Sequence, residues 1–132
     1  MIVRRLTDLD NTDRAVHGPT FVSRRFLLAD DGVGYSLHDT VLYAGTTTDM
    51  WYQNHLESVY VIEGTGTLTD RSTGEVHPIT PGTLYVLDGH EQHQLFAETN
   101  LRAVCVFTPP LTGQELHDED GTYPLLTPSD VA

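Results

Sequence analysis

The sequence is divided into short apolar runs, each followed by residues that favour tight turns. The runs are rich in β-branched and aromatic residues, and turn residues such as Asp30-Asp31-Gly32 and Pro81-Gly82 separate them. The 3.6-residue period of an amphipathic helix is absent, and the best helical candidate covers residues 6–14. Many short strands with turns every eight to twelve residues or so are typical of an all-β sandwich or barrel. The strands expected from this pattern cover residues 2–6, 21–28, 35–43, 58–63, 65–69, 75–79, 83–87, 94–97 and 101–107.

The charge balance excludes several classes of partner. The chain of 132 residues is long enough for one domain with a substantial core. Its 19 acidic residues stand against 7 arginines and no lysine, for a formal net charge of -12. We therefore expect no binding to nucleic acid or to an anionic membrane surface. Such acidity fits either a protein that works at high salt or a host with lysine-poor codon usage.

Location and domain limits follow from a few further features. No apolar run approaches the ~20 residues of a membrane span, and no signal peptide is recognisable. The single cysteine, Cys105, excludes an internal disulfide and favours the cytoplasm. Thr108-Pro109-Pro110 ends the last strand, because proline cannot donate to a sheet ladder. An ordered loop or short helix is expected next, followed by a tail. The expected domain covers residues 1–126, and the expected tail covers residues 127–132.

Three distant side chains are candidates for a metal site. Alternation along the strand places Glu57 on the same face as Val59 and Val61, where a buried carboxylate is costly unless it is paired or binds a metal. Tyr85 points inward from a second strand, and His93 begins a third. Each alone is more simply a hydrogen-bonded core residue. Together, a carboxylate, a phenol and an imidazole inside one barrel favour a metal ion.

The histidines near this trio leave several roles open. His90 and His93 form an H-x-x-H pair, but Gly89 and the flanking strands indicate a loop, so we do not expect both to be ligands. His55 lies two residues before Glu57 and points the same way on a continuous strand. It is a neighbour of the metal, a residue that orients a ligand, or a turn residue.

Further inward positions are candidates for contact with a ligand. Cys105 shares a strand face with Phe107, and Phe21 shares one with Arg25, as His38 does with Thr40. An inward arginine is a natural clamp for a carboxylate, although either Arg24 or Arg25 taken singly is more commonly a surface residue. Cys105 on its own is typical of a small buried apolar residue.

Several motifs in order along the chain resemble known families. Glu57 with Gly64, and Gly82 with His93, resemble the two motifs of the cupin superfamily, but Trp51 and Gln53 stand where a typical cupin has its His-x-His ligands. The wider sequence resembles the ectoine synthase family from Met1 to about Leu126. The segments that carry this resemblance include 23–25, 38–40, 52–57, 74–79, 102–107, 109–113, 115–121 and 123–126.

Membership of that family would imply a cupin-type, jelly-roll-like β-barrel with short helical turns near the termini, assembled as a homodimer. It would imply cyclisation of N-γ-acetyl-L-2,4-diaminobutyrate to ectoine with loss of water. Iron(II) would be held by Glu57, Tyr85 and His93 and would act as a Lewis acid. Positions that match the family's substrate-lining residues are Arg25, Thr40, Tyr52, Cys105, Phe107, Glu115 and His117.

The resemblance also limits the candidates for proton transfer. These are Tyr52, His55, Glu115 and His117, and the segment 112–117 is expected to close over the substrate. His38 lies in the same lining region, with an identity that varies in the family, and Phe21 stands where the family commonly has tryptophan.

Two other functions compete with this one. The first is another small iron-dependent cupin enzyme such as a dioxygenase, which Trp51 and Gln53 argue against and which oxygen consumption would reveal. The second is a cupin module that binds a small molecule without turnover.

Overall fold

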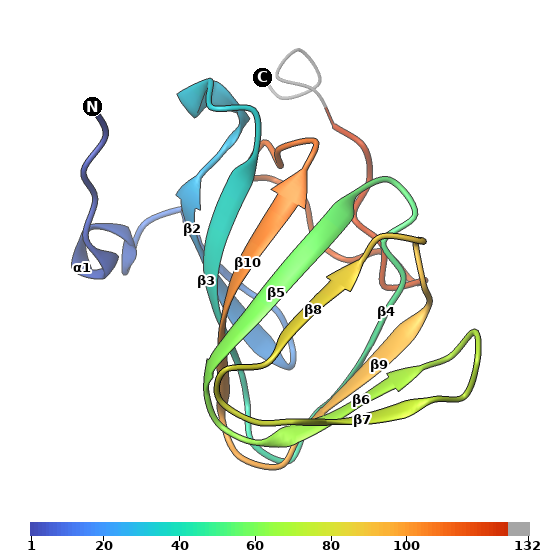
Figure 1. Ribbon diagram of the computed structural model, residues 1–132. Helices are drawn as coiled ribbons and strands as arrows, with labels where there is room; N and C mark the ends of the chain where they lie inside the picture. The colour runs from blue at the N-terminus through green and yellow to red at the C-terminus, as the bar shows by residue number, and fades with distance from the viewer. Residues whose placement is uncertain (127–132) are drawn as a thin grey trace.

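Two antiparallel β-sheets pack face to face and enclose the interior of the domain (Figure 1). The computed structural model describes residues 1–126. The larger sheet has the strand order β1-β2-β3-β10-β5-β8, and the smaller sheet has the order β4-β9-β6-β7. This arrangement confirms the all-β fold expected from the spacing of strands and turns, and it fits the cupin-type architecture that the family resemblance implies. The domain limit at residue 126 stays a prediction, and the expected tail, Thr127–Ala132, lies outside the described residues.

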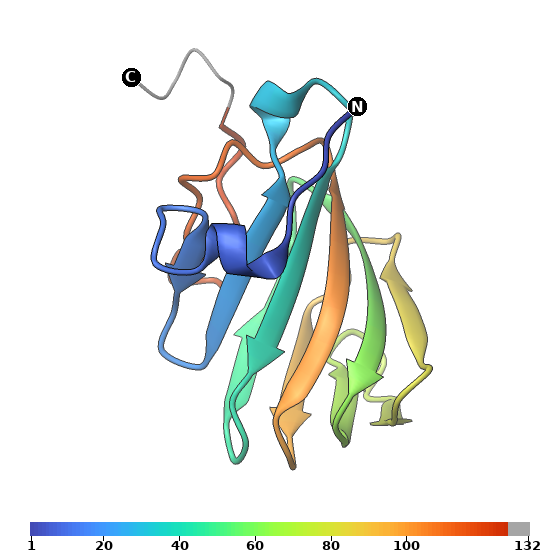
Figure 2. The same cartoon turned by 90° about the vertical axis from the view of Figure 1, so that its left-hand side faces the viewer.

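The elements are short, as the turn spacing predicts. The larger sheet consists of β1 (Ala15–His17), β2 (Phe21–Leu27), β3 (Ser36–Leu42), β10 (Leu101–Thr108), β5 (Leu56–Glu63) and β8 (Leu84–Leu87). The smaller sheet consists of β4 (Thr47–Met50), β9 (His93–Ala97), β6 (Gly66–Asp70) and β7 (Val76–Ile79). The one-turn helix α1 (Leu6–Leu9) lies outside the larger sheet, beside β2 (Figure 2), and a 3-10 turn, Ala29–Asp31, joins β2 to β3.

The core forms where the inward faces of the two sheets meet. Along β10, Leu101, Ala103, Cys105 and Phe107 are buried, and the residues between them are half-buried on the outer face. The same alternation buries Glu57, Val59 and Val61 of β5. Each strand therefore lends every second side chain to the interior, as a two-residue period requires.

Some expected elements differ from those observed. Residues 2–6 do not form a strand, and Arg4 of this segment donates from its side chain to the carbonyl of Phe26 instead. The helix expected over residues 6–14 ends at Leu9, because Asn11 adopts a left-handed backbone with φ of 61°. The pattern also missed β1 and β4, which are short and weakly apolar. In the described part of the chain, no helix follows β10.

An irregularity in β2 follows Arg25 directly. Regular alternation buries Phe21, Ser23 and Arg25 on one face. Pairing with β3 then shifts register between Arg25 and Leu27, so Phe26 occupies a β-bulge, and the next buried side chain is Leu28, three residues after Arg25. Within residues 1–126, none of the helices is long and apolar enough to cross a bilayer.

Candidate active site

A cavity between the two sheets contains most of the polar residues that the sequence singled out. Its interior volume is about 40 Å³, well below the roughly 300 to 1,000 Å³ of typical small-molecule pockets, so the side chains leave only a narrow hollow between the sheets. The predicted site residues on its wall are Phe21, Thr40, Tyr52, Glu57, Tyr85, Cys105, Phe107 and His117. Residues far apart in the sequence therefore meet here because strand pairing places β2, β3, β10, β5 and β8 side by side.

Glu57 is a buried carboxyl group in mostly apolar surroundings. Burial raises its pKa to about 8, and a hydrogen bond with Cys105 opposes that shift only partly. Burial together with the nearby Glu57 raises the pKa of the Cys105 thiol well above its usual value. The carboxylate form of Glu57 is therefore unfavourable by itself, and a cation beside it would stabilise that form.

His93 presents an unused nitrogen to the interior. Its Nδ1 lies 3.0 Å from the carbonyl of Glu91, so Nδ1 carries the proton and Nε2 keeps a free lone pair. Nε2 is buried and has no hydrogen-bond partner among the described residues. Burial lowers the pKa of His93, which keeps the ring neutral. A buried neutral imidazole held in this way has the protonation state of a metal ligand.

Tyr85 lies between two hollows. It lines the main cavity with Glu57, and it also lines a second groove together with His93. Burial and the nearby Glu57 raise the pKa of Tyr85 well above its usual value. Within residues 1–126, no three Asp, Glu, His or Cys side chains form a potential metal cluster. A site built on Glu57 and His93 therefore needs the phenol as its third ligand.

Aromatic rings close the cavity at the end where β10 leaves the sheet. Tyr52 stacks on Tyr123 with centroids 5.2 Å apart and an angle of 19° between the planes. Phe107 meets Tyr52 edge-on at 5.1 Å, and His117 lies 4.4 Å from Tyr123. Tyr123 was missed as a site residue. The family-like segment 123–126 was the available signal, but its position gave no indication that it folds back over the cavity.

Tyr52 and His117 form a hydrogen-bonded pair on the cavity wall. The Tyr52 hydroxyl lies 2.9 Å from Nε2 of His117 and 3.2 Å from Sδ of Met50. Burial, reinforced by Arg25, lowers the pKa of His117 to about 4, and burial raises that of Tyr52 well above its usual value. Both groups are therefore neutral near pH 7, and the hydroxyl can donate to the imidazole.

Arg25 is fully buried behind the aromatic rings. Its Nη2 donates to the carbonyl of Glu115 at 2.9 Å, and its guanidinium lies over the Tyr123 ring at 5.8 Å. Its Nη1 has no hydrogen-bond partner among the described residues. A buried guanidinium with an unused N–H pair suits an anionic ligand.

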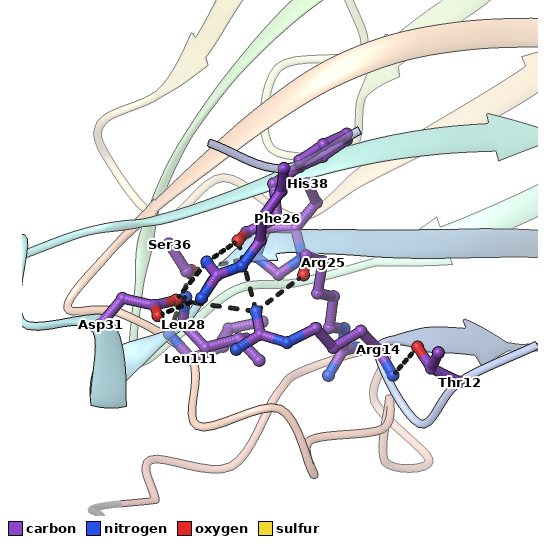
Figure 3. Close-up of polar contacts among 10 residues, drawn as sticks. Thr12, Arg14, Arg25, Phe26, Leu28, Asp31, Ser36, His38 and Leu111 are labelled. Atoms are coloured by element: carbon purple, nitrogen blue, oxygen red, sulfur yellow. Dashed lines mark hydrogen bonds and ion pairs between the residues drawn. The ribbon is translucent and has the colours of Figure 1, made fainter. Parts of the chain in front are cut away.

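Two arginines bind the bulge that follows Arg25 from outside, and Figure 3 shows one of them, Arg14, beside Arg25 and Phe26. Arg14 donates to the carbonyls of Arg25 and Phe26 at 3.2 and 3.3 Å. Arg4 donates to the Phe26 carbonyl at 2.7 Å and forms two hydrogen bonds with the Asp31 carboxylate. The hydrogen bond from Arg4 holds the pKa of Asp31 below its usual value. The carbonyls that the bulge leaves out of the sheet are thus satisfied.

The comparisons with known proteins agree over nearly the whole chain. The sequence profile described as ectoine synthase matches residues 1–127. The protein named L-ectoine synthase from Streptomyces anulatus is 58% identical over 129 residues, covering 96% of this chain and 98% of that relative. The one from Thermobifida fusca is 58% identical over 127 residues, covering 96% and 95%.

The chain belongs to the ectoine synthase family.

Solved structures support the same assignment. The crystal structure of ectoine synthase from P. lautus superposes with a TM-score of 0.87 at 55% identity, covering 97% of this chain and 92% of that one. A cupin domain of a transcriptional regulator from Enterobacter cloacae has a TM-score of 0.57 at 16% identity over 69% of this chain and 98% of its own, which supports the cupin fold alone.

Besides Arg25, which lies behind the aromatic rings, three residues expected at the substrate site are not on the cavity wall. His38 is packed behind it, with its two ring nitrogens 3.3 and 3.0 Å from the hydroxyls of Ser23 and Ser36. His55 is buried against Phe107 and Tyr123, and its Nδ1 has no partner in the described part of the chain. Burial lowers the pKa of both histidines.

The carboxylate of the third residue, Glu115, is engaged by its own loop. It accepts hydrogen bonds from the backbone of Thr112 and Gly113 and from the Thr112 hydroxyl, at 2.8 to 3.0 Å. This arrangement fixes the expected closing segment, 112–117, in a docked position. The loop held in this way presents the backbone carbonyl of Glu115 to the side chain of Arg25. A part for the Glu115 carboxyl group in proton transfer stays a prediction.

The positions where this family departs from typical cupins have other partners. Trp51 donates from Nε1 to the carbonyl of His90 at 3.0 Å, and His90 is 2.8 Å from the carbonyl of Tyr52. Gln53 donates to the Thr122 hydroxyl at 3.2 Å. Both side chains thus anchor loops around the cavity instead of supplying metal ligands.

Proposed function

We propose that this protein cyclises N-γ-acetyl-L-2,4-diaminobutyrate to ectoine with loss of water. The observation that carries the proposal is the 58% identity with a relative named L-ectoine synthase over nearly the full length of both chains. The cavity supports it, because its wall combines a neutral hydroxyl–imidazole pair with a buried carboxyl group, and a buried arginine lies directly behind the Tyr123 ring of that wall. We place the reaction in the cytoplasm on the strength of the single cysteine and the acidic composition.

The reaction forms one bond and breaks one within the same substrate. The α-nitrogen bonds to the acetyl carbon, the carbon–oxygen bond of the amide breaks, and the product is a six-membered cyclic amidine. The oxygen leaves as water with two hydrogens from the α-ammonium group. The protein must therefore fold the substrate, move these protons and keep bulk water out.

Arg25 is the group best suited to hold the substrate carboxylate. Its Nη1 is unpaired among residues 1–126, and the stacked ring of Tyr123 keeps solvent away from the guanidinium. The interaction would be strong because Arg25 is already out of water, so only the substrate carboxylate loses its hydration on binding, and the attraction acts in a low-dielectric interior. The α-amine, next to the carboxylate, would then lie near the Tyr52–His117 pair.

Among the four candidates for proton transfer, Tyr52 and His117 have the best position. Both line the cavity, and the Tyr52 hydroxyl lies within hydrogen-bonding distance of Nε2 of the neutral His117. The pair can pass a proton from the amine toward the leaving oxygen without creating a lasting buried charge. His55 and Glu115 lie behind this wall, and we assign them to support it.

Glu57, Tyr85 and His93 would hold iron(II). The unpaired buried Nε2 of His93 and the costly burial of the Glu57 carboxylate both fit a bound cation. When bound, the metal would supply Lewis acidity toward the amide oxygen. Tyr85 lines both the main cavity and the second groove, and His93 lines the second groove, which fits a metal site between the two.

Ring closure by the purified protein, with and without iron(II), tests the proposal. Product is followed by chromatography, and iron content is measured on the same samples. Glu57→Ala and His93→Ala are expected to lose both bound iron and turnover. The exposed Glu75 and His17 supply matched controls, and their alanine variants should keep both properties. Full activity after stringent chelation would rule out the metal's part, and no cyclisation by the iron-loaded wild type would rule out the function.

A homodimer is part of the same proposal. The outer face of β5 and β8 exposes Leu56, Tyr60, Leu84 and Val86, an apolar surface unusual for an isolated acidic domain. Sedimentation of the wild type and of Leu84→Glu tests this assignment, and a monomeric wild type would contradict it.

A further inference from the structure

A second hollow reaches the proposed metal ligands from outside the sandwich. It is the second groove, and its volume is about 570 Å³, against about 40 Å³ for the main cavity. The strands β7 and β8 border it, and each is the last strand of its sheet (Figure 1). No ladder of hydrogen bonds joins these two strands within residues 1–126, so the sandwich is open between them. Two of the three proposed metal ligands, Tyr85 and His93, line this groove.

The inner end of the groove contains a nitrogen atom that lacks a partner. His93 is 1% exposed, and its Nδ1 is held by the carbonyl of Glu91 at 3.0 Å. Its Nε2 is buried and has no hydrogen-bond partner in the described chain. A buried nitrogen in this state is costly unless a ligand meets its lone pair. The groove therefore ends at an atom suited to accept a cation.

The groove connects that atom with bulk water. The exposed side chains of His77 and Asp88 line its outer part. The aromatic rings that close the main cavity, those of Tyr52, Phe107 and Tyr123, do not line the groove in the described part of the chain. An ion can therefore reach His93 from solvent without passing these rings.

The charges along the groove suit a cation. Its acidic side chains are Asp70, Asp88 and Glu91, and no arginine lines it within residues 1–126. Asp70 lies directly opposite His93 in the pairing of β6 with β9, and Glu91 precedes His93 by two residues. None of the three carboxylates forms an ion pair among the described residues. A groove lined by one sign of charge concentrates counter-ions and speeds their binding by roughly 10- to 1,000-fold.

The three carboxylates do not form a metal site of their own. Among the described residues, no three Asp, Glu, His or Cys side chains lie together as a potential metal cluster. Asp70 accepts a hydrogen bond from the backbone N–H of Ser72 at 2.8 Å, and Glu91 accepts one from the backbone N–H of Gly89. Each carboxylate is therefore tied to its own turn, where it can attract an ion that then moves on to His93.

We propose that the second groove is the loading path of the metal, along which Asp70, Asp88 and Glu91 draw a divalent cation from solvent to His93. The inference rests on the proposed function for the metal site at which the path ends. It makes a kinetic prediction. Changes along the groove should alter how fast the metal is loaded and should leave the amount bound at saturation unchanged.

Metal loading is measured by mixing the metal-free, full-length protein with cobalt(II), whose visible absorption reports binding. Cobalt(II) accepts the same nitrogen and oxygen ligands as iron(II) and binds them more tightly. Asp70→Asn/Glu91→Gln should load about tenfold more slowly at low salt, with a weaker dependence on ionic strength. Asp13→Asn/Glu98→Gln removes the same charge from exposed positions outside the groove and should load like the wild type. Asp88→Asn/Glu91→Gln is the second test if Asp70→Asn impairs folding.

A bulky label tests the position of the path independently of charge. Cys105 is buried, so a maleimide reacts selectively with a cysteine introduced at the surface. The labelled His77→Cys variant has its groove filled and should load about tenfold more slowly than the same variant without the label. The labelled His17→Cys variant is the matched control, because the exposed His17 lines a different groove, beside Phe21 and His117.

The loading path and the proposed function fail in different ways. If the groove variants load as fast as Asp13→Asn/Glu98→Gln, or if only the labelled His17→Cys variant is slowed, the path lies elsewhere. Less cobalt(II) bound at saturation in Asp70→Asn/Glu91→Gln would make these carboxylates part of the metal site and overturn their role in a path. A wild type that binds neither cobalt(II) nor iron(II) contradicts the metal site and the path together. Slow loading of the groove variants supports the path even if the iron-loaded wild type does not cyclise the substrate, which contradicts the proposed function alone.

Discussion

Tyr52 combines a packing role with a chemical one in a single residue. Its ring stacks on Tyr123 and meets Phe107 edge-on, while its hydroxyl reaches His117. Aromatic contacts of this kind contribute about 0.5–1.5 kcal/mol beyond burial. The ring and the hydroxyl can be separated by substitution, because phenylalanine keeps the first and removes the second.

Tyr52→Phe is expected to lower kcat about 100-fold, the effect typical of a lost acid–base group. The free energy of unfolding should fall by about 1 kcal/mol, because one buried hydrogen bond is lost and the ring remains. Steady-state kinetics and urea unfolding check both values. Tyr60→Phe, on the exposed outer face of β5, is the control. An unchanged kcat in Tyr52→Phe would contradict the proton-transfer assignment.

At the scale of elements, the N-terminal segment and the β2 bulge act as one unit. Arg14 binds two carbonyls of the bulge, and the backbone N–H of Arg25 donates to the carbonyl of Arg14 at 2.9 Å. Strand alternation points Arg25 inward, and the position of its backbone is held by a residue outside the cavity.

Arg14→Ala should raise KM about tenfold with a smaller change in kcat, because the carboxylate clamp is displaced while the reacting groups stay in place. Its unfolding free energy should fall by about 1–3 kcal/mol, since buried carbonyls lose their donor. Arg14→Lys restores only part of this, because one ammonium group lacks the forked geometry. The exposed Arg71 provides the alanine control. If the KM of Arg14→Ala equals that of Arg71→Ala, Arg14 does not position Arg25.

The segment after β10 is the second element that completes the site. It returns over the end of the sandwich, where the backbone N–H of Trp51 donates to the carbonyl of Gly121 at 3.0 Å. Gly121 has φ of 72°, and a Cβ there would lie 2.9 Å from Cα of Met50. A side chain at this position therefore prevents the segment from docking.

Gly121→Ala is expected to open the cavity, with at least a tenfold loss of kcat/KM and increased binding of a hydrophobic dye. Gly32→Ala is a matched control, because Gly32 has the same φ of 72° with open space around it. In Gly32→Ala, the only expected effect is the strain of a left-handed backbone on alanine, which lowers the free energy of unfolding by about 1–2 kcal/mol. Equal behaviour of the two variants would mean that strain, and not the lost docking, explains the effect.

At the scale of the whole molecule, buried histidines control stability in acid. Burial lowers the pKa of His38, His55, His93 and His117 in the folded protein. The unfolded chain, with ordinary histidine pKa values near 6.5, therefore binds more protons than the folded one below that pH. The stability from neutral burial is complete above about pH 6.5 and is lost as the pH falls through the folded values.

The metal-free protein should accordingly lose stability from about pH 6.5 downward, because the four histidines outweigh the single Glu57 carboxyl, whose raised pKa of about 8 acts in the opposite direction. Each histidine contributes up to about 1.4 kcal/mol per pH unit while it is protonated only in the unfolded chain. Urea unfolding from pH 7.5 to 4.5 measures the slope. His117→Gln should reduce that slope between pH 6.5 and about 4, where the pKa of His117 lies. A flat profile over this range would contradict the neutral burial of the histidines.

Much of the fold was readable from local patterns. Alternation along residues 101–107 and 58–63 predicted two strands, because a period of two reflects burial on one face. These strands lie side by side in the larger sheet. β4 was missed, since Thr47 and Asp49 on its exposed face and Thr48 on its buried face give little apolar signal. The Phe26 bulge left no signal either, because it depends on arginines far away in the sequence.

The candidate site shows the same division. Glu57, Tyr85 and Cys105 could be assigned to the interior from their strand positions, and the cavity contains them. The hydrogen bonds of His38 to two serines, and those of Glu115 to its own loop, came only with tertiary structure. Tyr123 entered the site because a distant segment folds back onto Tyr52.

By itself, the sequence determined the strands, the inward faces and the chemical types of the interior side chains, because these depend on neighbours along one strand. Only the tertiary structure decided which polar atoms stay unpaired, namely Nε2 of His93, Nη1 of Arg25 and Nδ1 of His55 in the described chain. Whether a buried group finds a partner depends on segments brought together from across the fold. The amino-acid order supplies the groups, and packing decides which of them remain free to bind a ligand.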